Sequence, residues 1–209
     1  MIKFENTEIY GWEEAIRGMR NPMNSWNLSD SGFEFDGLWD IGHNDLNLMK
    51  KLINAGTDHR KFMRMITVYV DITAPLYWWK EFDTYKVGTV ANSCSTMHKI
   101  HDKEFTLEDF SLEHLIRSNA TLIERIIIRL NFAREKFIET KDKKWWWQMI
   151  QLLPSSYNQK RTVQMNYEVL ANMYKSRKHH KLDEWSIDFI RWIESLPYSE
   201  LITMKDKEN

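Results

Sequence analysis

The sequence predicts an α+β fold in a single domain over residues 1–209, in which a mixed or antiparallel sheet packs with helices. Its apolar content of 43% is sufficient for a hydrophobic core. The segment 61–72 is rich in β-branched residues and predicts a strand. The segment 121–140 repeats apolar residues at helical spacing and predicts a long helix. No internal repeat or low-complexity linker divides the chain.

Local periodicity and end signals place the other elements. Residues 1–5 alternate apolar and polar side chains, as in a short strand. Pro75 marks a helix start and Pro154 a helix end, and Thr121 with Glu124 forms the pattern of a capping box. Helices are therefore expected over 12–19, 45–56, 74–86, 107–118, 121–140, 144–154, 166–177 and 183–197, with loops or connectors at 21–43, 92–98 and 155–165.

The composition argues against nucleic-acid binding and against a membrane protein. Lys plus Arg (29) nearly balance Asp plus Glu (30), so no global field attracts nucleic acid or an anionic membrane. Apolar stretches such as 126–130 are interrupted by charges well before membrane-spanning length, and no N-terminal stretch resembles a signal peptide. The single Cys94 cannot form an internal disulfide, which suits a reducing compartment. We therefore expect a soluble, cytoplasmic protein.

The expected helix at 166–177 carries a spaced set of polar residues. Asn166 and Arg177 are eleven residues apart, so they project on one face, roughly 16 Å apart along the axis. Asn172 lies on a different face, as if it addressed a neighbouring surface or a second chain. An extended ligand, or two ligands side by side, could contact this set. The alternative is an ordinary amphipathic helix with solvated polar residues.

The order of motifs along the chain is more specific than any one helix. Ala74 and Pro75 lead through a charged aromatic segment into NSCSTMH at 92–98. Further on, LLP at 152–154 is followed by Asn166, Asn172 and Arg177. In this order the chain resembles the flavin-dependent thymidylate synthases, the thymidylate synthase complementing protein family. Members of that family carry an AP segment, an RQ pair, the signature RHRxxSxNExSxRY, a segment ending in LP, and Asn, Asn and Arg on one helix.

The resemblance can be followed residue by residue from about Gly56 to Pro197. At the C-terminal end, the Leu-Pro pair and Asn166, Asn172 and Arg177 match at identical spacing. In the signature, Asn92 and Ser95 match, after one inserted residue, while Ser93, Met97 and His98 replace the family's Glu, Arg and Tyr. Lys80 and Glu81 fall on the RQ pair, Thr84, Tyr85 and Lys86 fall on the RHR triplet, and His59 falls on a family His.

The resemblance implies a homotetramer of the thymidylate synthase complementing protein-like fold, with FAD sites where subunits meet. The implied reaction is reductive methylation of dUMP to dTMP, with NADPH and methylenetetrahydrofolate as co-substrates and no metal. Ser95 and Arg177 are the implied catalytic residues. Substrate contacts are implied for Glu81, Ser93, Ser95, Met97 and Arg177, and cofactor contacts for His59, Thr84, Tyr85, Lys86, Asn92, Asn166 and Asn172. In this family no enzymic cysteine attacks uracil, so Cys94 need not be a nucleophile.

The replaced residues leave alternatives open. Thr84, Tyr85 and Lys86 provide one ammonium and a phenol in place of the two guanidinium groups and an imidazole of the triplet. We favour an enzyme, in which Lys80, Lys86, His98 and Lys99 restore part of the lost positive charge. One alternative is a divergent homologue that binds FAD or a nucleotide without making dTMP. Another is a helical protein whose aromatic face binds a partner protein.

Two further patterns have plain interpretations. The run KKWWWQ at 143–148 could lie at a membrane interface, but packing in the core or against a second subunit is the favoured interpretation. Neighbouring histidines could bind a metal, but solvated or capping roles are favoured because no third ligand stands at fixed spacing. The residues concerned are His98, His101, Asp102, His179 and His180.

Overall fold

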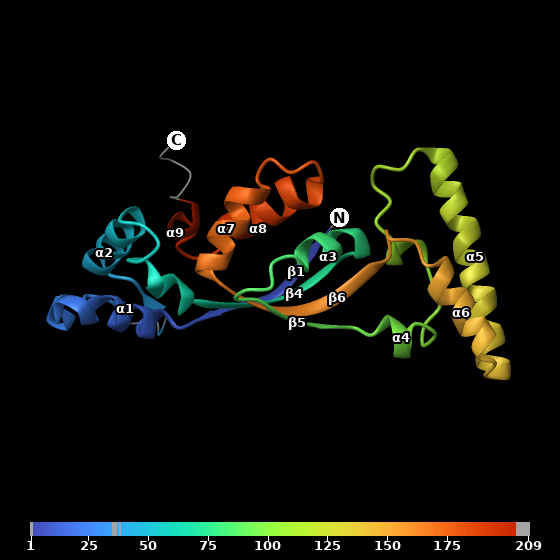
Figure 1. Cartoon of the computed structure of the whole chain (residues 1–209), viewed down its shortest axis with the longest axis horizontal. Coiled ribbons are helices and arrows are strands. Elements are labelled where there is room, and N and C mark those ends of the chain that lie inside the picture. The colour runs from blue at the N-terminus through green and yellow to red at the C-terminus, as the bar shows by residue number, and fades with distance from the viewer. Residues whose placement is uncertain (1, 35–36, 38, 204–209) are drawn as a thin grey trace. The chain divides into compact units, whose positions relative to one another are not determined.

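The computed structural model describes residues 2–34, 37 and 39–203, and the chain divides into two compact units (Figure 1). Unit 1 comprises residues 1–3, 71–84 and 91–162. Unit 2 comprises residues 4–70, 85–90 and 163–209. The single domain expected over 1–209 stays a prediction.

Four strands form one sheet in the order β1-β4-β6-β5. Their bounds are Lys3–Tyr10 for β1, Thr67–Pro75 for β4, Asn158–Asn166 for β6 and Val90–Ser93 for β5. Helices account for most of the remaining regular structure. This combination confirms the predicted α+β class.

Two strands illustrate what local sequence can predict. In β4 the side chains of Val68, Val70 and Ile72 are almost fully buried, which matches the β-branched strand signal. The strand β6 lies in the expected connector and was not predicted. Its sequence NQKRTVQMN contains only two apolar residues, Val163 and Met165, too few to give an alternating signal.

The core of unit 1 lies between the helices α5 (Arg117–Thr140) and α6 (Lys143–Leu152), which lie side by side in Figure 1. Within the tryptophan run, Trp145 and Trp146 are half-buried against this core, as expected, and Trp147 is exposed. Unit 1 also contains α3 (Leu76–Phe82) and α4 (Thr96–Lys99). The buried core cluster consists of Ile100, Phe105, Phe110, Ile127, Leu130, Ala133 and Met149.

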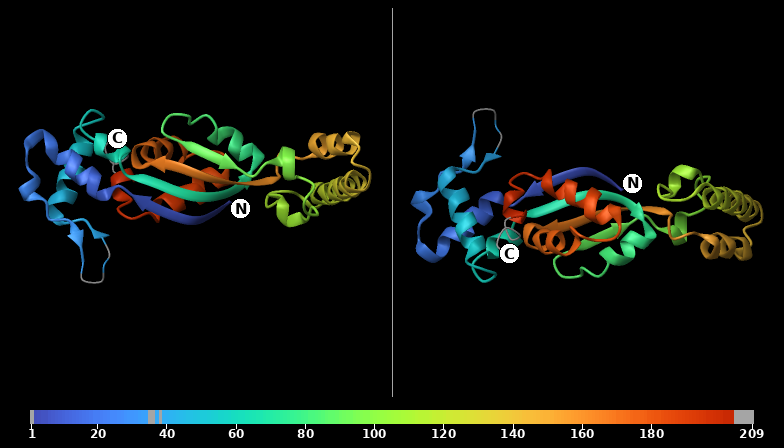
Figure 2. Two further views of the ribbon diagram at one scale, coloured as in Figure 1. Left: turned by 90° about the horizontal axis from the view of Figure 1, so that it is seen from below. Right: turned by 90° about the horizontal axis from the view of Figure 1, so that it is seen from above.

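The core of unit 2 is aromatic. Tyr167, Trp185 and Phe189 are fully buried, and the backbone N–H of Tyr167 donates to the carbonyl of Ile66 (3.1 Å). Figure 2 shows α7 and α8 of this unit side by side. The helices of unit 2 are α1 (Trp12–Arg20), α2 (His43–Asn54), α7 (Tyr167–Arg177), α8 (Ile190–Glu194) and α9 (Glu200–Thr203).

The prediction of a helix over 107–118 is wrong. Residues Leu107–Asp109 form only a 3₁₀ turn, and the next helix begins at Arg117. A capping box does occur, but at Thr106 and Asp109 rather than at Thr121. Five residues in the 107–118 segment are apolar, and two of them, Phe110 and Leu112, pack on the unit 1 core from non-helical backbone. Helical spacing of apolar residues therefore misled the prediction.

Other elements differ from the prediction in their type or bounds. The expected loop at 21–43 contains two 3₁₀ turns and a short antiparallel pair of β2 (Gly32–Phe33) with β3 (Trp39–Asp40). The helix expected over 183–197 begins as a π-helix at Glu184–Phe189 and continues as α8, while its aromatic face is buried as predicted. Within the described part of the chain, none of the helices is long and apolar enough to cross a bilayer.

Candidate functional site

Two of the predicted site residues meet in unit 2. The guanidinium Nε of Arg177, at the end of α7, donates to the Tyr85 hydroxyl at 2.7 Å, although 92 residues separate them. The guanidinium carbon lies 5.1 Å from the centre of the Tyr85 ring and 4.8 Å from that of Trp185. A guanidinium group stacks favourably on aromatic faces because each ring carries negative charge on its face. Arg177 is therefore held in a fixed orientation and is half-buried.

The loop that carries Tyr85 packs tightly on the start of α7. Gly88 has φ +77°, and a Cβ there would lie 2.7 Å from Val169 and 3.2 Å from the Asn166 amide nitrogen. Only glycine suits this position, since both the backbone conformation and the contact exclude a side chain. Asn166 caps α7, because its side-chain oxygen accepts the Val169 backbone N–H at 3.0 Å. Asn166 and Arg177, which were expected on one helix face, thus lie at the N-cap and in the last turn of the same helix, α7.

Three further predicted residues lie in unit 2. Asn172 is exposed on α7, and Lys86 is exposed in the Tyr85 loop. His59 is exposed in the turn before β4. Its neighbour Arg60 is buried and pairs with Glu168 of α7 at 2.8 Å, which fixes the His59 segment to this helix. Sequence alone did not single out Trp185 as part of this group, although its aromatic spacing predicted burial.

The NSCSTMH segment lies in unit 1 and is only partly a loop. Asn92 and Ser93 are exposed at the end of β5, and Met97 is exposed in α4. The Ser95 hydroxyl caps α4 by accepting the backbone N–H of His98 at 3.1 Å. This is the local role expected of a loop serine, so the Ser95 oxygen already has one partner.

Ser95 also lines a cavity of about 590 Å³ in unit 1. The Cys94 backbone is fixed at its wall, because its N–H donates to the Lys160 carbonyl (2.9 Å) and its carbonyl accepts the Gln159 side chain (2.8 Å). Burial raises the pKa of Tyr157, with a smaller contribution from Asp109, so this phenol stays protonated at neutral pH.

The charges around this cavity are largely compensated. Lys99 pairs with Asp102 at 3.0 Å, and Lys103 pairs with Asp109. Lys160 pairs with Asp71 at 3.2 Å. An anionic ligand would therefore have to compete with carboxylates for these ammonium groups.

The remaining predicted residues of unit 1 are Glu81 and Thr84. Both lie at the end of α3, where the Thr84 hydroxyl donates to the Glu81 carbonyl at 2.7 Å. Ser95 belongs to unit 1 and Arg177 to unit 2, so their convergence around one ligand stays a prediction. The histidine candidates form no metal site within the described residues, where no three His, Cys, Asp or Glu side chains gather.

Taken as a whole, the chain has the α+β fold found in flavin-dependent thymidylate synthases. Two crystal structures of thymidylate synthase X from Helicobacter pylori, each with FAD and dUMP, match it with a TM-score of 0.69. The first is 15% identical and the match covers 98% of this chain and 97% of that one. The second is 16% identical, with 98% of both chains covered. No protein-family model matches the sequence, and no curated protein does so either.

Proposed function

We propose that this protein is a flavin-dependent thymidylate synthase-like enzyme that converts dUMP to dTMP with methylenetetrahydrofolate and NADPH. The observation that carries the proposal is the likeness of fold over 98% of the chain to an enzyme solved with FAD and dUMP. The contact between Tyr85 and Arg177 supports it, because both residues were placed in the site by the order of motifs. The proposed assembly is a homotetramer in the cytoplasm.

Each site residue has a task in this proposal. Arg177 would bind the uracil or phosphate of dUMP, since a guanidinium fork matches planar acceptors and oxyanions. Tyr85 and Trp185 orient that fork through the hydrogen bond and the stacked rings. Ser95 keeps its hydroxyl proton for a ligand while its oxygen caps α4. The substrate contacts proposed for Glu81, Ser93 and Met97 rest on the resemblance alone.

The exposed side chains of unit 2 fit a flavin cofactor. Asn172 provides an amide that can both donate and accept, as flavin ring edges require, and Asn166 stands at the other end of the same helix. Lys86 and His59 would lie along the FAD phosphates or ring system, and the contacts proposed for Thr84 and Asn92 rest on the resemblance. When bound and reduced, the flavin supplies hydride to the reaction.

A divergent homologue that binds FAD or a nucleotide without making dTMP is the second candidate. Two observations favour it. The Ser95 oxygen already serves its own helix, and lysines at the unit 1 cavity are paired with carboxylates. Each lost charge-assisted contact typically weakens binding by about 1.5–3 kcal/mol, so several replacements together could abolish dUMP binding.

A test of the proposal combines flavin absorbance with tritium release from 5-tritiated dUMP in the presence of NADPH and methylenetetrahydrofolate. The proposal expects bound flavin and tritium release in the wild type. It expects release to fall at least about tenfold in Arg177→Ala, because one charge-assisted contact to dUMP is lost. The matched control is Arg191→Ala, which removes an exposed arginine from α8 of the same unit.

The outcomes separate the candidates. Bound flavin without tritium release favours the divergent homologue and contradicts the proposed reaction. The absence of both bound flavin and tritium release contradicts both candidate functions. Equal loss in Arg177→Ala and Arg191→Ala contradicts the role proposed for Arg177.

A further inference from the structure

Unit 2 contains a buried ion pair that belongs to none of the matched motifs. The guanidinium Nη2 of Arg60 donates to Glu168 Oε1 at 2.8 Å, and Arg60 Nε lies 2.8 Å from Glu168 Oε2. The two side chains are only 5% and 9% exposed. Because two nitrogens face two oxygens, the contact has a fixed direction as well as a fixed distance.

The ion pair joins the turn that carries His59 to the first turn of α7. The Gly56 carbonyl accepts the backbone N–H groups of His59 (3.1 Å) and Arg60 (3.3 Å), so these two residues belong to one closed turn. Glu168 lies in the first turn of α7, next to the Asn166 cap. The contact between Arg60 and Glu168 therefore contributes to fixing the exposed His59 beside this helix.

The same turn of α7 holds the loop that carries Lys86. A Cβ on Gly88 would lie 2.7 Å from Val169 and 3.2 Å from the Asn166 amide nitrogen, so the loop lies directly against this turn. Three of the residues proposed to contact the flavin, His59, Lys86 and Asn166, thus come from segments that are far apart in the sequence and meet at the first turn of α7.

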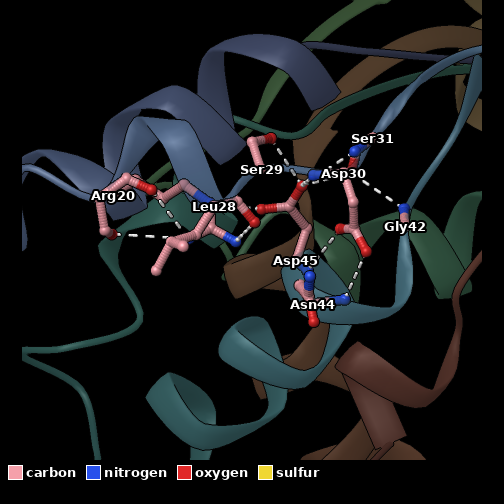
Figure 3. Close-up of polar contacts among 9 residues, drawn as sticks. Arg20, Leu28, Ser29, Asp30, Ser31, Gly42, Asn44 and Asp45 are labelled. Carbon is pink, nitrogen blue, oxygen red and sulfur yellow. Dashed lines mark hydrogen bonds and ion pairs between the residues drawn. The ribbon is translucent and has the colours of Figure 1, made fainter.

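Stability alone does not require charged residues at this buried contact. Taking two ions out of water is costly, and apolar residues of similar volume often stabilise a fold equally well. The pairing of a guanidinium fork with a carboxylate instead specifies one relative orientation of the two segments that it joins. Another buried ion pair of unit 2, between Arg20 and Asp45, hydrogen-bonds segment 25–31, outside the segments proposed for the cofactor (Figure 3).

We propose that Arg60 and Glu168 are positioning residues for the flavin, which hold the His59 side chain through their ion pair in the orientation that binds the cofactor. This role rests on the flavin contact proposed above for His59. Because the turn is fixed before the cofactor binds, less conformational entropy is lost on binding, and the affinity is higher. Neither residue needs to touch the cofactor, since both side chains are buried against each other.

The test measures the affinity of the flavin-free protein for FAD, from the quenching of flavin fluorescence, together with urea unfolding. Arg60→Met combined with Glu168→Met replaces the ion pair by apolar side chains of similar length, so the fold is kept while the directed contact is lost. FAD affinity should fall about five- to tenfold. Arg60→Lys keeps a positive charge but not the two-point contact, and it should weaken FAD binding as well.

A double-mutant cycle tests whether the ion pair acts through His59. His59→Ala removes one proposed contact to the cofactor and should weaken FAD binding by itself. In the His59→Ala background, replacing the ion pair should change FAD affinity by less than about twofold, because the side chain that it positions is gone. A purely structural role would give the same loss in both backgrounds.

The matched control is Asp45→Asn, which disturbs the buried ion pair with Arg20 in the same unit. It should lower the free energy of unfolding and leave FAD affinity unchanged. The inference is overturned if FAD affinity is the same in the wild type and both ion-pair variants, or if the loss is equal with and without His59.

A wild-type protein that binds no FAD also overturns the inference, and it contradicts the proposed flavin cofactor as well. FAD binding with the expected coupling to His59, but without tritium release from dUMP, supports the inference and contradicts only the proposed reaction.

Discussion

Two hydroxyl-rich segments of this chain, 29–31 and 92–98, are similar in composition and differ in what their side chains do. In the first, the hydroxyls of Ser29 and Ser31 both donate to the buried carboxylate of Asp45. In the second, most side chains are exposed, and the Ser95 oxygen serves a four-residue helix. The difference shows that a small polar segment becomes part of the scaffold when a distant residue provides a buried charge for it. A segment without such a charge keeps its side chains accessible, as a ligand site requires.

Removing the charge from the first segment should have the largest effect. We expect Asp45→Ala to lower the free energy of unfolding by about 3–5 kcal/mol, because it leaves Arg20 buried without its carboxylate. Urea unfolding measures this change in free energy. The control is Asp102→Ala, which removes an exposed member of an ion pair in unit 1. A loss below about 1 kcal/mol would mean that the Asp45 carboxylate does not hold segment 25–31 in place.

The same carboxylate predicts a dependence on pH. Burial raises the pKa of Asp45, but hydrogen bonds from Ser31, Ser29 and Arg20 together outweigh burial and hold the pKa below its usual value. A carboxyl with a lowered pKa in the folded state stabilises the protein above the unfolded-state pKa of about 4, and this contribution is lost as the pH falls through the folded pKa. The difference in unfolding free energy between wild type and Asp45→Asn should therefore shrink below about pH 4. A constant difference down to acid pH would contradict the pKa shift.

Gly42 offers a steric way to disturb the hydrogen-bond network of Arg20, Ser29, Asp30, Ser31 and Asp45 without touching its charges (Figure 3). A Cβ on Gly42 would lie 2.3 Å from the carbonyl oxygen and carboxyl carbon of Asp30. We expect Gly42→Ala to lower the free energy of unfolding by about 2 kcal/mol, as overpacking does. The matched control is Gly32→Ala, where a Cβ would have nothing within 4 Å. Equal unfolding midpoints for the two variants would show that segment 29–31 can shift freely.

The two segments also mark what the sequence could predict. The strand β4 and the long helix α5 were predictable because their burial repeats with the period of the element. The hydrogen-bond network around Asp45 was not, since Arg20 and Asp45 stand 25 residues apart and neither has a pattern that indicates the other. Segment 21–43 is predicted as a loop for its small polar residues. Its described part contains two 3₁₀ turns and the β2–β3 pair, and the loop prediction does not reveal the residues that bind the buried carboxylate.

The candidate site was predictable only through the order of motifs. Tyr85 and Arg177 are brought into contact by the fold across 92 residues, and no local period relates them. Their placement followed from the resemblance, while Trp185, which completes the stack on Arg177, belongs to no matched motif. No fixed sequence spacing relates Ser95 to these two residues, so their convergence around a ligand stays a prediction.

The smallest effect compares one serine from each segment. Ser31 and Ser95 are both half-buried, but the Ser31 hydroxyl donates to Asp45 and accepts the Gly42 N–H at 3.0 Å, whereas the Ser95 oxygen accepts one N–H. Ser31→Ala should therefore cost about 1–2 kcal/mol of unfolding free energy, because it leaves the half-buried Gly42 N–H and the buried Asp45 carboxylate each short of a partner. Ser95→Ala should cost at most about 0.5–1 kcal/mol, the usual value of a helix cap, because water can replace the hydroxyl at the end of a short exposed helix. Urea unfolding measures the free energy of unfolding of both variants. A larger decrease in Ser95→Ala than in Ser31→Ala would contradict the distinction between a scaffold serine and an accessible one.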